Sequence, residues 1–115
     1  MIMVQSTFQL HADKKHEALS LMKNMVRLCR QENGCLSYEY FEGVTDPNQV
    51  VLLQEWESAH CLEGHYQTKH MEDFLSKLGD YLQSPVTTRS YVSQEEREAR
   101  QQQSDQPAKS KRVIH

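Results

Sequence analysis

Hydrophobic and polar residues alternate along the first ten positions of the chain. One face of this alternation is mostly apolar, and it carries Ile2, Val4, Ser6, Phe8 and Leu10. A period of two residues is typical of a β-strand with one buried face. We therefore predict that the chain opens with such a strand over residues 2–10.

The spacing of apolar residues then lengthens to that of an amphipathic helix. The predicted buried stripe consists of Leu19, Met22, Val26 and Cys29, with Ala18, Leu21, Met25 and Leu28 beside it. Asp13 precedes the stripe and can cap the helix, because an aspartate accepts hydrogen bonds from free N–H groups. Asn33-Gly34 follows the stripe and predicts the stop.

Two more strands follow, joined by a short polar loop. Leu36, Tyr38 and Tyr40 alternate with polar residues, and the loop at 43–48 contains Asp46-Pro47. The next run, Val50-Val51-Leu52-Leu53, is apolar at every position. Such a strand is expected to be buried on both faces.

The last third of the folded region is predicted to contain two helices and a final strand. Ser58 and Thr68 are candidate N-caps, and Glu72 and Asp73 fall in the first turn after Thr68. The second of these helices has an apolar face made of Phe74, Leu75, Leu78 and Leu82. Pro85 precedes the strand predicted for 86–92.

This order of elements, β-α-β-β-α-β, predicts an α+β fold of the ferredoxin-like type. Its helices can cover only one face of the four-stranded antiparallel sheet. The run Val50–Leu53 is nevertheless apolar on both faces. A second copy of the chain, packed sheet against sheet, would cover the other face, so we expect a homodimer.

Composition divides the 115 residues into a domain at 1–93 and a polar C-terminal tail at 94–115. The tail is rich in Gln, Glu, Arg, Ser and Lys, which predicts disorder or a partial helix. The domain has 8 Lys or Arg against 12 Asp or Glu, so a nucleic-acid surface is not expected. Three cysteines in no metal-binding pattern and no long apolar run favour a cytoplasmic protein without a membrane span.

The richest stretch for chemistry begins at Gln54-Glu55-Trp56-Glu57-Ser58 and continues to three histidines. Imidazole transfers protons near neutral pH, and an indole can form the wall of an apolar pocket. His60, His65 and His70 are five residues apart, which does not suit paired metal ligands on one helix. Nucleotide-binding fingerprints are also missing from the sequence.

Four segments of the chain carry a resemblance to a known family. They are Asn33-Gly34-Cys35-Leu36-Ser37-Tyr38, Asp46-Pro47, Gln54-Glu55-Trp56-Glu57-Ser58 and Leu62-Glu63-Gly64-His65-Tyr66-Gln67-Thr68-Lys69-His70-Met71. Through them the chain resembles the antibiotic biosynthesis monooxygenase (ABM) domain family, and most its small bacterial quinol monooxygenases, over residues 1 to about 92. The family often has a glutamate two residues before the tryptophan, where this chain has Gln54.

The resemblance implies a dimeric α+β barrel and a monooxygenase that oxidises quinols or related phenols with O₂ and without a cofactor. His65 and His70 are then the candidate catalytic groups. The candidate substrate-binding residues are Trp56, Tyr38, Phe74 and Gln54. Convergence of the two histidines requires the chain to break its helix at Thr68.

Other functions stay open from the sequence. The same residues suit an isomerase or tautomerase of a small oxygenated metabolite, such as a signal molecule, which would consume no O₂. A protein that binds a small ligand or haem without catalysis is a further alternative. Each residue named also has a simpler interpretation, in which the aromatics pack the core and the histidines form ordinary hydrogen bonds.

Overall fold

A four-stranded antiparallel sheet forms one layer of the protein. In the computed structural model, which describes residues 1–94, its order is β2 (Cys35–Glu42), β3 (Gln49–Trp56), β1 (Ile2–Gln9) and β4 (Thr87–Val92). β1 is central and pairs with both β3 and β4. The predicted tail lies outside the described residues, apart from its first residue.

Residues of β1 and β3 that face the helices are the buried ones. Ile2 lies opposite Trp56, and Phe8 lies opposite Val50. Exposure alternates strictly along both strands, so every second residue enters the core. The alternation seen in the sequence of β1 therefore predicted its inner face correctly.

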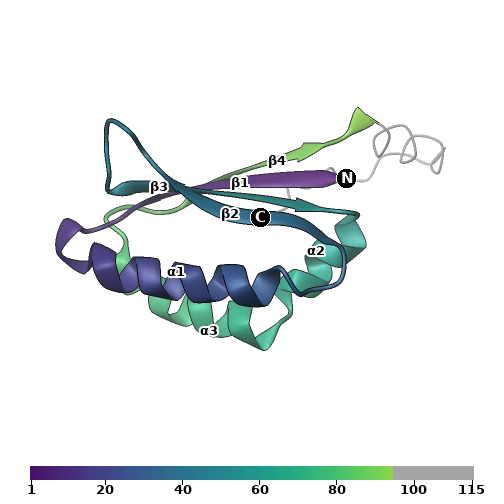
Figure 1. Ribbon diagram of the computed structural model, residues 1–115, viewed down its shortest axis with the longest axis horizontal. Helices are drawn as coiled ribbons and strands as arrows, with labels where there is room; N and C mark the ends of the chain where they lie inside the picture. Colours follow the sequence, from purple (N-terminus) through teal and green to yellow (C-terminus); the bar gives the residue numbers. More distant parts are fainter. Residues whose placement is uncertain (95–115) are drawn as a thin grey trace.

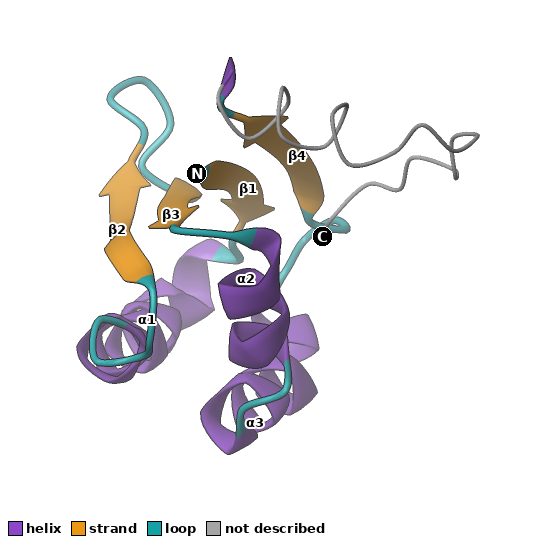
Figure 2. Ribbon diagram, turned by 90° about the vertical axis from the view of Figure 1, so that its right-hand side faces the viewer, coloured by secondary structure: helices purple, strands orange, loops and turns teal. Residues whose placement is uncertain are grey.

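The helices between β1 and β4 lie on one side of the sheet. They are α1 (Lys15–Cys29), α2 (Ala59–Tyr66) and α3 (Lys69–Leu78), with short 3₁₀ turns η1 (Ala12–Lys14) and η2 (Gly79–Tyr81). Figures 1 and 2 show this layer beneath the sheet. The arrangement is the ferredoxin-like α+β fold that the sequence predicts. Each helix within residues 1–94 is too short or too polar to cross a membrane.

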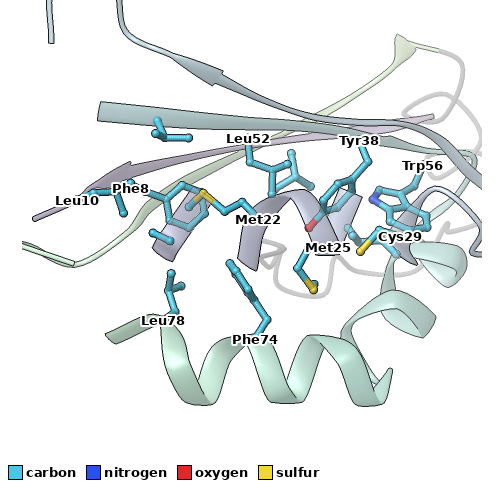
Figure 3. Close-up of a cluster of buried hydrophobic side chains, with 14 of the residues drawn as sticks. Phe8, Leu10, Met22, Met25, Cys29, Tyr38, Leu52, Trp56, Phe74 and Leu78 are labelled. Carbon is cyan, nitrogen blue, oxygen red and sulfur yellow. The ribbon is translucent and has the colours of Figure 1, made fainter. Parts of the chain in front are cut away.

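The core fills the space between the two layers. Met22 from α1 and Phe74 and Leu78 from α3 point toward the sheet, while Met25 from α1 points toward α3 (Figure 3). Three residues at the Trp56 end, Tyr38, Trp56 and Cys29, are almost completely buried. This end is also where the chemically active side chains gather.

The two helix caps predicted after β3 are confirmed. Ser58 Oγ accepts the N–H of Cys61 at 3.2 Å, and Thr68 Oγ1 accepts the N–H of Met71 at 3.3 Å. Because Thr68 has extended backbone angles, it separates α2 from α3 and changes the direction of the chain.

Four details of the sequence prediction need correction. Asp13 does not cap α1, because η1 precedes the helix and neither N-cap position makes a side-chain bond. α1 ends at Cys29, before the predicted stop. On the face predicted for α3, Leu75 is 54% exposed and Leu82 lies beyond the helix. β4 begins at Thr87, one residue later than predicted.

Gly34 forms the turn between α1 and β2. Its φ of +82° is in the left-handed region, which glycine adopts without steric cost. A Cβ atom at this position would lie 2.3 Å from Sγ of Cys61 on α2. The turn therefore passes so close to α2 that only glycine fits without a shift.

The face of the sheet that points away from the helices carries several apolar side chains. Phe41 is 50% exposed, and Val51 and Leu53 are half-buried. Phe41 lies opposite Val51 across β2 and β3. Within residues 1–94, no helix covers this face (Figure 1).

Candidate active site

A mostly apolar cavity of about 260 Å³ lies between the sheet and α3. Three of the four predicted substrate-binding residues line it, namely Tyr38, Gln54 and Phe74. Tyr66 and Met71, from α2 and α3, add to the wall. The cavity is larger than the roughly 150 Å³ that accepts benzene in an engineered protein core.

Trp56, the fourth predicted residue, lies behind the cavity wall. Its side chain is fully buried, and its indole N–H donates to Oε1 of Gln54 at 2.8 Å. The carbonyl oxygen of the amide is therefore fixed toward the indole, which leaves the NH₂ group of Gln54 as the available donor. Since Gln54 lines the cavity, Trp56 orients the one amide donor that a bound molecule would meet.

The helix break at Thr68 brings His65 and His70 together on Glu32, a residue that no pattern in the sequence singles out. Glu32, in the turn after α1, has both carboxylate oxygens 3.1 Å from Nδ1 of His65. Nε2 of His70 is 2.6 Å from Oε2 of the same carboxylate. One carboxylate thus binds two imidazoles that come from different helices.

These three groups span the distance from the core to the surface. The side chain of His65 is fully buried, while those of Glu32 and His70 are 12% and 24% exposed. Burial lowers the pKa of His65, and the hydrogen bond and charge of Glu32 oppose that shift. A carboxylate only accepts hydrogen bonds, so neutral His65 carries its proton on Nδ1. Its other nitrogen, Nε2, is buried and has no hydrogen-bond partner among residues 1–94.

Aromatic rings surround the His65 imidazole. Its centroid lies 4.8 Å from that of Trp56, 5.3 Å from Tyr66 and 5.7 Å from Tyr38. Burial raises the pKa of Tyr66 to about 12 and that of Tyr38 still further, so both phenols stay protonated at neutral pH. The two tyrosines stand between His65 and the apolar cavity, because their rings touch both.

The histidines border cavities other than the apolar one. His65 and Glu32 line an open cavity of about 260 Å³ between α2 and the turn after α1, together with His60. His70 lines a smaller one, of about 160 Å³, between α1 and α3. The predicted pocket residues and the predicted proton-transfer residues therefore occupy adjacent spaces with a layer of aromatic rings between them.

Cys29 completes the surroundings of Glu32. Its buried Sγ, one oxygen of Glu32 and one nitrogen each from His65 and His70 all lie within 4.8 Å of one another. The three cysteines of the chain are free thiols, and burial together with the charge of Glu32 raises the pKa of Cys29 well above its usual range. Thiol, carboxylate and imidazole are all groups that bind transition metals.

Comparison with known proteins agrees with this fold. The sequence profile of a family described as "Antibiotic biosynthesis monooxygenase" matches residues 1–77. A solved structure titled "Crystal structure of antibiotic biosynthesis monooxygenase" superposes with a TM-score of 0.77 over 81% of this chain and 98% of that one, at 24% identity. That likeness supports the fold.

Three relatives illustrate the range of similarity. An uncharacterised Synechocystis protein is 30% identical over 78% of this chain, which spans 61% of that longer protein. "Putative monooxygenase YcnE" of Bacillus subtilis is 30% identical over 75% of this chain and 90% of its own length. "Probable quinol monooxygenase YgiN" of Escherichia coli is 28% identical over 63% of this chain and 78% of its own length.

Proposed function

Because the chain belongs to the antibiotic biosynthesis monooxygenase family, we propose that it oxidises a quinol or a related phenolic aromatic with O₂ and without a cofactor. The observation that carries this proposal is the apolar cavity with a single oriented amide donor, Gln54. Such a cavity suits a flat, uncharged ring that carries oxygen atoms. The name of the Escherichia coli relative supports a quinol as the class of substrate.

The chemistry needs little from the protein, because the substrate supplies the electrons. A quinol that loses a proton becomes electron-rich enough to reduce O₂. One oxygen atom forms a bond to a ring carbon, and the other leaves as water. The product is a hydroxyquinone, so the four electrons that reduce O₂ all come from the ring. The protein binds the ring, removes the proton and excludes water.

We assign the substrate contacts to the cavity wall. Tyr38 and Phe74 contact the ring faces, with Trp56 supporting the wall from behind, and each ring contact contributes on the order of 1 kcal/mol beyond burial. The NH₂ group of Gln54 donates to the substrate oxygen on which negative charge develops. A donor in an apolar cavity stabilises such charge more than the same donor in water.

We assign proton transfer to His65 and His70. His65 Nε2 accepts the proton, since it is a free acceptor that Glu32 holds in the correct tautomer. Glu32 then stabilises the imidazolium, and His70 lies where the carboxylate approaches the surface. Tyr38 or Tyr66 must shift to open the path, because their rings separate His65 from the cavity.

The uncovered face of the sheet supports a homodimer, as a dimeric α+β barrel. Phe41, Val51 and Leu53 form an apolar surface there that a second copy would bury. The sheets of the two copies would then lie face to face. Each subunit keeps its own cavity on the helical side of its sheet.

Oxygen uptake tests the proposed function. The full chain is mixed with a panel of quinols and naphthols, and O₂ consumption is followed with an electrode. His65→Ala is expected to lower kcat by about 10²–10⁴ while circular dichroism stays unchanged. His60→Ala is the matched control. His60 is an exposed histidine five residues earlier on the same helix, so its replacement should leave kcat unchanged. Turnover of a substrate without O₂ uptake would contradict the proposal and favour an isomerase or tautomerase.

A further inference from the structure

Four side chains that can bind metals converge where the end of α1 meets the junction of α2 and α3. They are Cys29, Glu32, His65 and His70, and we refer to them as the Cys–Glu–His–His cluster. We propose that this cluster binds a divalent transition-metal ion of the zinc class. The proposed catalytic chemistry does not use Cys29, and the cluster gives this buried thiol a chemical role.

The donor set and its spacing suit zinc. Zn²⁺ is commonly four-coordinate, with thiolate at about 2.3 Å and imidazole or carboxylate at about 2.0–2.2 Å. A tetrahedral ion therefore holds its ligand atoms roughly 3–4 Å apart. In the cluster, both carboxylate oxygens of Glu32 lie 3.1 Å from Nδ1 of His65, and Oε2 also lies 2.6 Å from Nε2 of His70. All four ligand atoms lie within 4.8 Å of one another, so only small shifts are needed.

The charges also balance around a dication. Among residues 1–94, Glu32 forms no ion pair with a lysine or arginine, and its salt-bridge partners are the two imidazoles. A carboxylate and a thiolate with two neutral imidazoles carry two negative charges, which one divalent ion neutralises. Metal binding displaces the protons of its ligands, so a dication would deprotonate the Cys29 thiol.

The open cavity beside Glu32 supplies a path for the ion. Glu32 and His65 form part of its wall, together with Asn33 and Thr68. An ion from solvent would reach the carboxylate first and then the buried Sγ of Cys29. An ion bound at a site with this access could exchange with free metal ions in solution.

Binding of the ion would switch off the proposed oxidation. Nδ1 of His65 and the carboxylate of Glu32 would bind the metal, which removes the pair assigned to proton transfer. This regulatory consequence rests on the proposed function, whereas the binding itself does not. The ion would therefore be an inhibitor of the enzyme rather than a cofactor.

Co²⁺ is the probe, because it replaces Zn²⁺ in tetrahedral sites and absorbs visible light. The full chain is treated with a chelator, kept reduced and titrated with CoCl₂. We expect one Co²⁺ per chain, intense visible bands, and a near-ultraviolet band from thiolate-to-cobalt charge transfer. Cys29→Ser should abolish the charge-transfer band, and His70→Asn should weaken binding at least tenfold. Cys61→Ser is the matched control. Cys61 lines the open cavity but is not one of the four ligands, so this variant should bind Co²⁺ as the parent does.

Each result decides the proposal. Failure of the parent chain to bind Co²⁺, or a charge-transfer band that survives in Cys29→Ser, would overturn it. If Cys29→Ser fails to fold, His70→Asn decides alone, since His70 is partly exposed and unchanged affinity in that variant would mean adventitious binding. ZnCl₂ added to the oxygen-uptake assay tests regulation separately. Bound Co²⁺ in a chain that oxidises nothing would leave the metal site standing and remove the proposed function.

Discussion

Replacement of Gly34 by alanine is expected to destabilise the protein strongly. The residue has a φ of +82°, and the new Cβ would lie 2.3 Å from Sγ and 2.7 Å from Cβ of Cys61. The left-handed conformation costs an alanine about 1–2 kcal/mol. Overpacking of a closely packed site typically adds about 1–3 kcal/mol.

The total, about 2–5 kcal/mol, is a large part of the stability of an ordinary small domain, which is about 5–15 kcal/mol. Even 2 kcal/mol would lower Tm by about 8–16 °C in a domain of this size. Because the turn also carries Glu32 toward α2, the change should weaken the bond between Glu32 and His65 before the whole domain unfolds.

Urea unfolding followed by circular dichroism measures the loss of stability. A double-mutant cycle separates the part due to overlap with Sγ of Cys61 from the part due to the backbone conformation. Cys61→Ala removes the Sγ atom that the new methyl group would meet. The pair Gly34→Ala and Cys61→Ala should therefore show a coupling of about 1–2 kcal/mol, within the range usual for contacting residues. The unfavourable φ and the overlap with Cβ of residue 61 remain in the double variant.

Gly64→Ala is the matched control. Gly64 lies inside α2, and a methyl group added there would meet no atom within 4 Å, so alanine should stabilise the helix by about 1 kcal/mol. The reasoning would be refuted by a Gly34→Ala variant within about 0.5 kcal/mol of the parent. Strict additivity of the two changes would refute the assigned contact with Cys61.

Four further outcomes follow from the structure. Gln54→Leu leaves the buried Trp56 N–H without its acceptor and should cost about 1–3 kcal/mol in urea unfolding. Thr68→Ala removes the cap of α3 and should cost about 1 kcal/mol in the same assay. Light scattering should give the parent chain twice its 13.5 kDa mass and Leu53→Lys the monomer mass, whereas a stable parent monomer would contradict the dimer. Truncation after Ser93 should leave Tm nearly unchanged, and a loss above about 2 kcal/mol would show that the tail contributes to stability.

Local spacing was sufficient to predict much of the fold. The alternation in β1 and the caps Ser58 and Thr68 depend on residues two to four positions apart, so the sequence alone contains them. Asp13 failed for a related reason. A capping residue is plausible wherever a helix pattern begins, but the 3₁₀ turn η1 contains Asp13 and moves the N-cap of α1 one residue later, to Lys14.

The most informative contact of the site was not predictable in this way. Glu32 is 33 residues from His65 and 38 from His70, and it lies in a turn with no repeating pattern. Only the packing of α1 against α3, and of the turn after α1 against α2, brings the three together. The same limit applies to the position of His65, since no local pattern shows on which side of Tyr38 and Tyr66 its ring lies.

The contact between Trp56 and His65 allows the intrinsic fluorescence of the protein to report changes at His65. The chain has one tryptophan, so all its indole fluorescence comes from a ring whose centroid is 4.8 Å from that imidazole. A positive charge or a transition metal next to an indole changes its emission. Events at His65 can therefore be timed in a stopped-flow instrument with unlabelled protein, and substrate entry, proton uptake and ion capture become separable by their rates.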